Sequence, residues 1–206
     1  MKKFERIGLV GRFRPLHKGA ASVLLSLCEQ AELVIIGIGS SNKYNVRNPF
    51  TPQEAEGMIR AFFDGKEGNF EFRHIPDFAH MSEYRNGEKW KKTVLRELGE
   101  LDGFVTGNPY VKKLLGTHYK IYDAFDIVPE DKRVTVRGTV VRQRMADFDD
   151  WQSLLPSETI NYLEKNDLVE RFRRTFADET LMNSKDEDDI TERESLEDEK
   201  KHARES

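Results

Sequence analysis

Residues 7–20 have the sequence IGLVGRFRPLHKGA, which predicts a buried strand that turns directly into a helix. The apolar run 7–10 ends at Gly11, as is typical of a buried strand followed by a sharp turn. Gly19 allows close approach to the backbone where the helix starts. Because a helix N-terminus presents free N–H groups and the positive end of the helix dipole, this turn suits a phosphate group.

The polar residues of the same turn suit phosphoryl chemistry. His17 can donate to phosphate oxygens, and Arg12, Arg14 and Lys18 add cationic donors nearby. An ordinary strand–helix loop with a surface histidine is the alternative. The combined spacing of Gly, Arg, Pro, His and Gly favours a functional loop, although it matches neither the Walker nor the dinucleotide-binding glycine pattern.

The rest of the chain alternates between strand and helix signals. Strands are predicted over residues 33–38, 70–75, 103–106 and 119–122. Helices are predicted near 20–28, after an N-cap at Thr51, over 88–98 and over 111–115. This alternation predicts an α/β fold with a mainly parallel sheet and helices on both faces. Ligands of such sheets bind beyond the carboxyl ends of the strands.

A second cluster has the sequence VRGTVVRQRM over residues 136–145. Thr139 is either the N-cap of a helix or a phosphate ligand, and Arg142 lies three residues further, on the same helical face. Their hydroxyl and guanidinium groups can therefore converge on one phosphate chain, because the planar arginine fork binds phosphate bidentately. A basic, solvated helix face is the alternative.

Composition limits the function classes. The 206 residues contain 33 Lys and Arg against 37 Asp and Glu, and this net charge of −4 argues against a general nucleic-acid binder. No apolar run approaches the roughly 18 residues of a membrane span, and no signal peptide is evident. The single Cys28 excludes an intrachain disulfide framework, and the histidines show no metal-ligand spacing. We expect a cytoplasmic protein without nucleic-acid or membrane partners.

The acidic balance belongs to the C-terminal end. Residues 185–206 hold ten acids and five bases, with only two sizeable apolar residues, so they cannot bury enough surface to fold alone. We predict one folded domain over residues 1–181 and an acidic, disordered tail over 182–206. A tail that binds a partner is the alternative.

Six segments resemble, in order, those of the archaeal-type nicotinamide mononucleotide adenylyltransferases of the nucleotidylyltransferase superfamily. The resemblance covers roughly residues 4–176. The segments match the family patterns GRFxPxHxGH at 11–20, IGIGSA at 36–41, R-x-PFT at 47–51, GNPLV at 107–111, GTxxRxRM at 138–145 and W-x-x-LLP at 151–156. The resemblance implies a Rossmann-like nucleotidyltransferase fold for residues 1–181.

The resemblance also implies a reaction. ATP and nicotinamide mononucleotide would give NAD and pyrophosphate by direct in-line attack, without a covalent enzyme intermediate. The protein would then act by positioning and electrostatic stabilisation. Mg²⁺ would bridge phosphate oxygens rather than occupy a dedicated protein site. The family resemblance further implies a homo-oligomer.

The family pattern assigns an ATP side to this sequence. Arg12 and Arg47 would contact ATP phosphates, His17 would lie on the phosphate chain, and Thr139 with Arg142 would hold the β- and γ-phosphates. Asn108 would lie near the adenine or ribose. The remaining residues expected at the ATP site are Gly11, Phe13, Gly19 and Val140.

The family pattern also assigns an acceptor side. The nicotinamide ring would stack on Trp90, with Asn86 nearby, and Asp77 and Phe78 would recognise the carboxamide. Gly39 and Phe50 complete the expected acceptor site. The alternatives are that Trp90 packs in the core beside Val94 and that Phe50 is simply buried.

One position departs from the family pattern: Ala20 stands where the family has a second histidine. Loss of one such donor typically costs about 10²–10³ in rate. The chain could be an engineered slow variant, a natural enzyme in which Lys18, Arg14 or another donor compensates, or a protein that has lost catalysis and kept nucleotide binding. We expect Ala20→His to raise turnover tenfold or more.

Other functions remain open at this point. Nicotinate mononucleotide, flavin mononucleotide or pantetheine phosphate could replace nicotinamide mononucleotide as the acceptor. A non-catalytic nucleotide sensor would bind ATP or NAD without releasing pyrophosphate. An interaction protein built around the acidic tail is a third alternative, and we expect truncation at about Leu181 to leave folding and nucleotide affinity intact.

Overall fold

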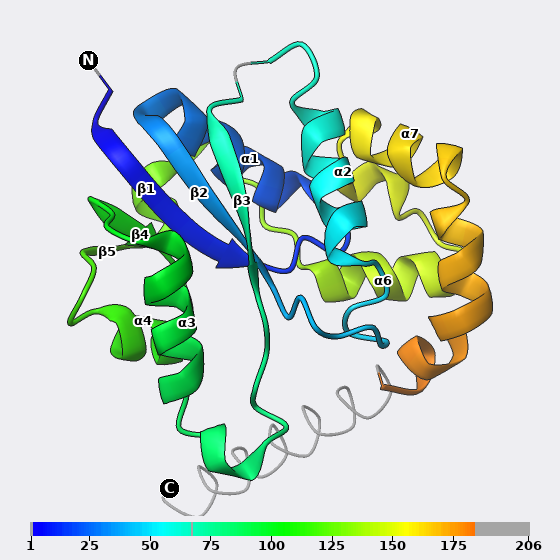
Figure 1. Ribbon diagram of the computed structural model, residues 1–206. Coiled ribbons are helices and arrows are strands. Elements are labelled where there is room, and N and C mark those ends of the chain that lie inside the picture. Colours follow the sequence, from blue (N-terminus) through cyan, green and yellow to red (C-terminus); the bar gives the residue numbers. More distant parts are fainter. Residues whose placement is uncertain (1, 67, 184–206) are drawn as a thin grey trace, which may run out of the picture.

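The computed structural model describes residues 2–66 and 68–183, and its centre is a five-stranded sheet (Figure 1). Every neighbouring pair of strands is parallel, and the order is β3-β2-β1-β4-β5. The strands are β1 Phe4–Gly11, β2 Ala31–Gly39, β3 Phe70–Ile75, β4 Gly103–Val105 and β5 Ile121–Tyr122. The strand order reverses at β1, so a crevice is expected beyond its carboxyl end.

Helices connect the strands and cover both faces of the sheet (Figure 1). They are α1 Lys18–Gln30, α2 Pro52–Phe62, α3 Glu88–Leu98, α4 Pro109–Leu115, α5 Ala124–Ile127, α6 Gly138–Ala146 and α7 Ser157–Lys165, and residues 168–183 are also helical. Short 3-10 turns occupy η1 Ser82–Tyr84, η2 Glu130–Lys132 and η3 Gln152–Leu154. None of the helices within the described residues is long and apolar enough to cross a membrane.

The alternation of side chains along β2 shows why helices are needed on both faces. Val34, Ile36 and Ile38 belong to the larger core cluster, which contains residues of α1, α2 and α6, whereas Ile35 packs in the smaller cluster with residues of α3 and α4. All four side chains are fully buried. A parallel strand that is apolar on both sides requires cover on both sides, so the predicted α/β fold is confirmed.

The local signals for the second helix are also confirmed. Thr51 caps α2 through a capping box with Glu54, and Pro52 takes the first helical position. The fifth strand is shorter than predicted, because β4 offers β5 only Phe104 and Val105 as partners. Tyr119, which was expected in that strand, instead stacks on Phe104.

The chain after α7 continues as a helix beyond the predicted domain boundary at residue 181. Two of the polar contacts of this helix reach other elements at short distance. Arg171 forms a bidentate ion pair with Glu54 of α2, with both N···O distances 2.6 Å, and Arg173 Nε donates to the Met145 carbonyl of α6 at 3.0 Å. Residues 182 and 183 continue the same helix. The rest of the predicted tail, residues 184–206, lies outside the described residues.

Candidate active site

Two neighbouring hollows lie beyond the carboxyl ends of the strands. The first, here called the cationic hollow, has a volume of about 250 Å³ and is lined by Arg12, Val46, Arg47, Thr139, Arg142, Gln143, Thr180 and Asn183. The second, here called the aromatic hollow, has a volume of about 350 Å³ and includes Phe78, Tyr84, Trp90 and Tyr110 in its wall. Arg12 lines both, so the two hollows meet at this residue.

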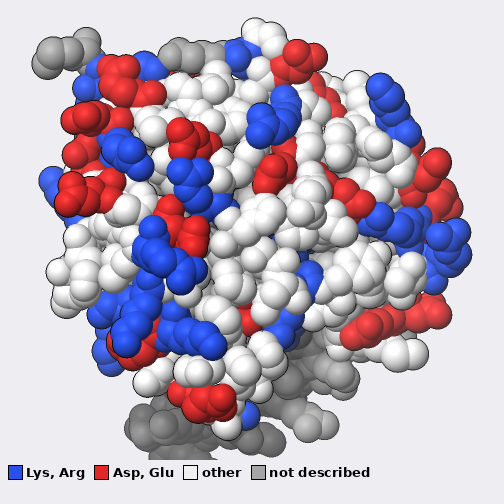
Figure 2. Space-filling model, in the orientation of Figure 1, with Lys and Arg blue, Asp and Glu red and all other residues white. Residues whose placement is uncertain are grey.

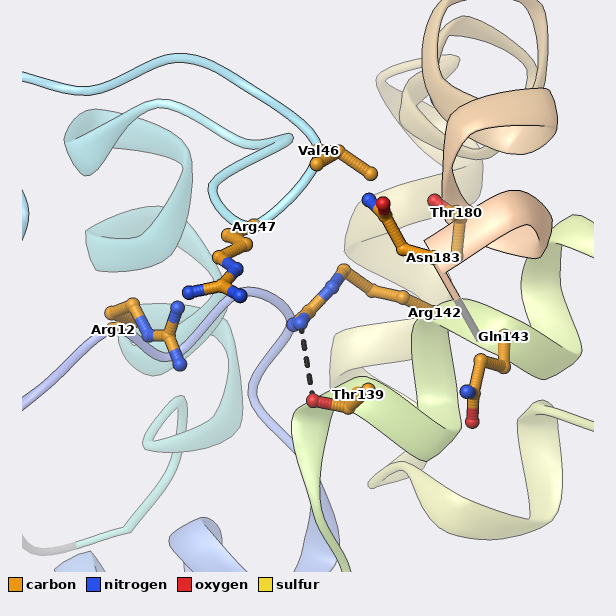
Figure 3. A pocket seen from close by; sticks show the side chains of 8 residues that line it. All are labelled: Arg12, Val46, Arg47, Thr139, Arg142, Gln143, Thr180 and Asn183. Atoms are coloured by element: carbon orange, nitrogen blue, oxygen red, sulfur yellow. Dashed lines mark hydrogen bonds between the residues drawn. The ribbon is translucent and has the colours of Figure 1, made fainter. Parts of the chain in front are cut away.

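Three arginine side chains point toward one another in the cationic hollow (Figure 3). Arg12 follows β1, Arg47 lies in the loop before α2, and Arg142 lies in α6. Acidic and basic side chains are intermixed over most of the face in Figure 2, whereas no Asp or Glu lines this hollow. Three cations without an anion in their midst favour a ligand with several negative charges, such as a polyphosphate.

Burial and the crowding of positive charge lower the pKa of Arg12. Partial burial lowers its pKa, the like charge of Arg47 lowers it further, and Asp77 opposes the shift. An anion that pairs with the guanidinium groups offsets both of the lowering effects, because an opposite charge favours the protonated form. The hollow is therefore prepared for a phosphate chain.

The predicted convergence of Thr139 and Arg142 is confirmed. The Arg142 guanidinium, which is buried, lies 3.4 Å from Thr139 Oγ1 and donates to the Arg14 carbonyl at 3.1 Å. The suggestion that Thr139 is the N-cap is wrong, because α6 begins at Gly138 and Arg137 takes the cap position. Thr139 is thus free of the cap role and lines the hollow.

His17 is held in one tautomer. It is the N-cap of α1, and its Nδ1 accepts a hydrogen bond from the Ala20 N–H at 3.2 Å. The neutral ring therefore carries its proton on Nε2. Burial, and then the positive charge of Arg142, lower the pKa of His17 to about 4. At neutral pH His17 is an uncharged donor, which can bind a phosphate oxygen through Nε2–H.

Two glycines are required by close contacts in the same region. Phe13 has φ +52°, and its ring folds back so closely that a Cβ on Gly11 would lie 2.7 Å from the ring. A Cβ on Gly19 would lie 2.6 Å from the Val134 carbonyl oxygen. The predicted close approach at Gly19 is therefore made by the protein's own backbone.

The two named candidates for compensating Ala20, Lys18 and Arg14, differ in their surroundings. Lys18 Nζ donates to the Ser153 carbonyl at 2.7 Å, outside the hollows. The Arg14 side chain is buried and directs Nη1 to the carbonyls of Ser40 and Lys43, at 3.3 and 3.4 Å. Lys18 is thus bound outside the hollows, whereas Arg14 Nε and Nη2 have no hydrogen-bond partner within the described residues, so Arg14 remains a candidate.

The aromatic hollow brings together most of the predicted acceptor residues. Its lining consists of Val10, Gly11, Arg12, Gly39, Ser40, Asp77, Phe78, Ala79, Tyr84, Arg85, Gly87, Trp90, Asn108, Tyr110 and Val111. Trp90 is partly buried, and it both lines the hollow and packs against the core cluster that contains Val94. The two alternatives for Trp90 are therefore compatible.

Three predicted residues lie elsewhere. Phe50 is fully buried against Phe172, with ring centroids 6.2 Å apart, so its predicted place in the acceptor wall is wrong and the burial alternative holds. Asn86 is absent from the lining because it turns away: its Oδ1 accepts from the Glu88 N–H at 3.1 Å at the start of α3. Val140 is exposed and lines neither hollow.

Asn108 lines the aromatic hollow together with the predicted acceptor residues. Its Oδ1 caps α4 by accepting from the N–H groups of Tyr110 and Val111, at 2.9 and 3.4 Å. The Asn108 oxygen is thus occupied by the fold. Its Nδ2, for which the described residues offer no hydrogen bond, is the part of the amide left for a ligand.

Sequence reasoning missed the contribution of the last described helix. Thr180 and Asn183 line the cationic hollow, and Figure 3 shows the Asn183 amide pointing into it, whereas Gln143 points away from the arginines. No local signal marks these two residues, since their place depends on the contacts of Arg171 and Arg173 with α2 and α6. Only the tertiary structure reveals them.

The site offers no cage for a metal ion. Within residues 2–66 and 68–183, no group of three or more His, Cys, Asp and Glu side chains is placed to bind one. A lining of arginines would repel a bare divalent cation.

The parallel sheet and the arginines at its carboxyl edge define a Rossmann-like protein of the nucleotidyltransferase class. Solved structures support this fold. The chain matches a bifunctional NMN adenylyltransferase/ADP ribose pyrophosphatase from Francisella tularensis, complexed with AMP and a manganese ion, with TM-score 0.60 and 17% identity, over 94% of this chain and 56% of that one. It also matches a putative nicotinate-nucleotide adenylyltransferase from Vibrio parahaemolyticus, with TM-score 0.51 and 19% identity, over 85% and 98% of the two chains.

Sequence relatives specify the family. The chain is 32% identical over 167 residues to the nicotinamide-nucleotide adenylyltransferase of Pyrococcus horikoshii, covering 80% of this chain and 85% of the relative. It is 30% identical over 174 residues to the enzyme of that name from Thermococcus sibiricus, covering 82% and 88%. No family model matches the chain. The chain belongs to the nicotinamide-nucleotide adenylyltransferase family.

Proposed function

We propose that this chain transfers the adenylyl group of ATP to nicotinamide mononucleotide, giving NAD and pyrophosphate. The observation that carries the proposal is the meeting of the cationic hollow and the aromatic hollow at Arg12. One hollow suits a polyphosphate and the other suits a planar ring, and an adenylyl transfer to a pyridine mononucleotide needs both side by side. The names of the curated relatives favour the same reaction.

The cationic hollow would bind the triphosphate. Arg12, Arg47 and Arg142 would pair with its oxygens, and the Thr139 hydroxyl would donate to the same chain. His17 would contribute Nε2–H as a neutral donor, since its Nδ1 is occupied by the Ala20 N–H. Such preorganised donors stabilise the charge that develops on the transferred phosphoryl group.

The aromatic hollow would bind the acceptor. Its pyridine ring would stack on Trp90, beside Phe78 and Asp77, and its phosphate would reach Arg12. An oxygen of that phosphate then attacks the α-phosphorus of ATP. One P–O bond forms to the acceptor, the bond from the α-phosphorus to the β-bridging oxygen breaks, and pyrophosphate leaves with the electron pair. The protein's part is to align the two phosphates at Arg12.

The nucleotide substrate is proposed to be MgATP. The described residues form no protein metal site, so the ion would arrive on the phosphate oxygens. A related structure was solved with AMP and a manganese ion, which is consistent with a divalent ion accompanying the nucleotide. Mg²⁺, a cytoplasmic location, a homo-oligomeric state, and a domain over residues 1–181 followed by an acidic tail over 182–206 are further parts of this proposal.

An acceptor panel tests the proposal. The full chain would be incubated with MgATP and, separately, nicotinamide mononucleotide, nicotinate mononucleotide, flavin mononucleotide and pantetheine phosphate, and both pyrophosphate and the adenylated product would be measured. We expect the highest kcat/KM with nicotinamide mononucleotide. A higher kcat/KM with one of the other acceptors would replace the proposed substrate with that acceptor.

A nucleotide sensor is the second candidate, and Ala20 is the observation that favours it. Without a histidine at this position the site lacks one donor that the family pattern contains. Binding of ATP without release of pyrophosphate in the presence of any of the four acceptors would favour the sensor. Formation of NAD would exclude it.

A further inference from the structure

A third hollow extends from the cationic site toward Ala20. It joins the turn after β1 to the start of α6, has a volume of about 400 Å³, and is lined by Gly11, Arg12, Phe13, Arg14, Pro15, His17, Ala20, Val136, Arg137, Gly138, Thr139 and Arg142. We call it the turn hollow. His17, Thr139 and Arg142 belong to it, so it adjoins the place where the triphosphate would lie. The methyl group of Ala20 leaves this space unfilled.

Gly138 shows how tightly the catalytic side chains surround the start of α6. A Cβ at Gly138 would lie 3.2 Å from Arg142 Nη1 and 3.8 Å from His17 Cδ2. The backbone of the residue before Gly138 therefore lies next to Arg142 and His17, the two groups proposed to bind the phosphates. That residue is Arg137.

The backbone of Arg137 is held by the start of α6, whereas its side chain makes no hydrogen bond or ion pair within the described residues. Its backbone is the N-cap of α6, with φ −110° and ψ 139°, and its carbonyl accepts from the Val141 N–H at 3.3 Å. Its exposed guanidinium has no hydrogen bond or ion pair with any residue in the described part of the chain. Lys18, by contrast, donates to a backbone carbonyl, and the Arg14 side chain is buried, with Nη1 directed to the Ser40 carbonyl. No Asp or Glu lines the turn hollow.

We infer that Arg137 is a catalytic residue that supplies, from the start of α6, the phosphate donor that Ala20 does not provide. Its guanidinium binds an oxygen of the transferred phosphoryl group on the side of Ala20, opposite Arg12. An arginine there can make two parallel hydrogen bonds to phosphate, so it can take the place of a single imidazole donor. This inference rests on the proposed function.

Reciprocal rescue tests the inference. The full chain, Arg137→Gln, Ala20→His and the double variant would be compared by kcat and KM with MgATP and nicotinamide mononucleotide. We expect Arg137→Gln to lower kcat by about 10²-fold, within the range for removal of one donor. We expect Ala20→His to restore at least tenfold of that loss in the double variant, because the imidazole would occupy the vacated position.

A matched control replaces an arginine outside the hollows that is also exposed and also without hydrogen bonds or ion pairs in the described part of the chain. Arg174 is exposed on the helix of residues 168–183 and has no hydrogen bond or ion pair within the described residues, so Arg174→Gln removes the same charge. We expect its kcat to stay within twofold of the original. Melting temperatures of all variants would separate catalytic effects from loss of folding.

Two results would overturn the inference: a kcat for Arg137→Gln within twofold of the original, or a double variant no faster than Arg137→Gln. If the original chain forms no adenylated product, the proposed function fails instead. The inference is then judged by equilibrium binding of ATP, which Arg137→Gln should weaken at least tenfold and Arg174→Gln should not.

Discussion

The cationic hollow and the aromatic hollow are adjacent, but they are assembled in different ways. The cationic hollow collects between one and three side chains from each of four segments: the turn after β1, the loop before α2, α6 and the helix of residues 168–183. The aromatic hollow is built mainly from the ends of β1 and β2 and from the segment between β3 and α4. The three arginines therefore come together only through long-range packing, whereas three of the four aromatic side chains, Phe78, Tyr84 and Trp90, lie within residues 78–90. Substitutions should separate the two functions accordingly.

Arg142→Gln should cause the largest difference between the two hollows, as measured by substrate binding and turnover. The Arg142 guanidinium is buried and lies close to both Thr139 and His17. It would pair directly with the phosphate oxygens. We expect kcat/KM for ATP to fall by about 10²–10³-fold, as for removal of a preorganised donor. The Kd for nicotinamide mononucleotide should change less than threefold, and a comparable loss of both would contradict the separation. Thermal melting would show whether the variant still folds.

Trp90→Ala should affect the other hollow. Stacking of a base on an aromatic side chain contributes about 1–3 kcal/mol, so we expect the KM for the acceptor to rise about 10–100-fold. The KM for ATP should stay within twofold, because Trp90 does not line the cationic hollow. Trp90→Phe keeps an aromatic face and should recover most of the loss. An unchanged acceptor KM in Trp90→Ala would leave Trp90 with its packing role alone.

Two truncations, after Asn183 and after Leu181, should sharpen the boundary of the cationic hollow. Only the shorter chain loses Asn183, whose amide points into the hollow. One hydrogen bond contributes about 0.5–1.5 kcal/mol, so the KM for ATP should rise about 2–10-fold in the shorter chain. The chain ending at Asn183 should match the full chain. Equal ATP affinity of the two truncations would support the initial expectation that residue 181 ends the functional domain.

The smallest effect concerns stability and pH. The folded chain lowers the pKa of His17 to about 4, from 6.5 in the unfolded chain, so the unfolded state binds more protons between these values. The free energy of unfolding should therefore decrease as the pH falls from 6.5 to 4, by up to about 1.4 kcal/mol per pH unit. Denaturant titrations of the original chain and His17→Gln would check this. A slope unchanged by His17→Gln would show that other groups cause the pH dependence.

The sheet could be predicted because its signals are local. Each of these signals spans only a few neighbouring residues: the apolar runs of β1 and β2, the cap at Thr51, and the turn that follows Gly11. All of them appear in the structure as expected. The convergence of Thr139 with Arg142 was also predictable, since helical spacing alone places them together.

Other parts of the site could not be predicted, because they depend on packing between distant segments. Nothing near Phe50 in the sequence indicates that Phe172 would bury it. Asn86 and Asn108 have the same side chain, yet Asn86 hydrogen-bonds to the start of α3 outside the hollow while Asn108 caps α4 within its wall. The approach of Asn183 depends on ion pairs and carbonyl contacts of its helix with α2 and α6.

The central claim is that the two substrates meet at Arg12, and a comparison of Arg12→Gln with Arg47→Gln tests it most directly. Arg12 lines both hollows, whereas Arg47 lines only the cationic one. The measurement is the KM of each variant for ATP and for nicotinamide mononucleotide. The account predicts that Arg12→Gln raises both KM values and that Arg47→Gln raises only that for ATP. If Arg12→Gln leaves the KM for nicotinamide mononucleotide unchanged, the two substrates do not meet at this residue.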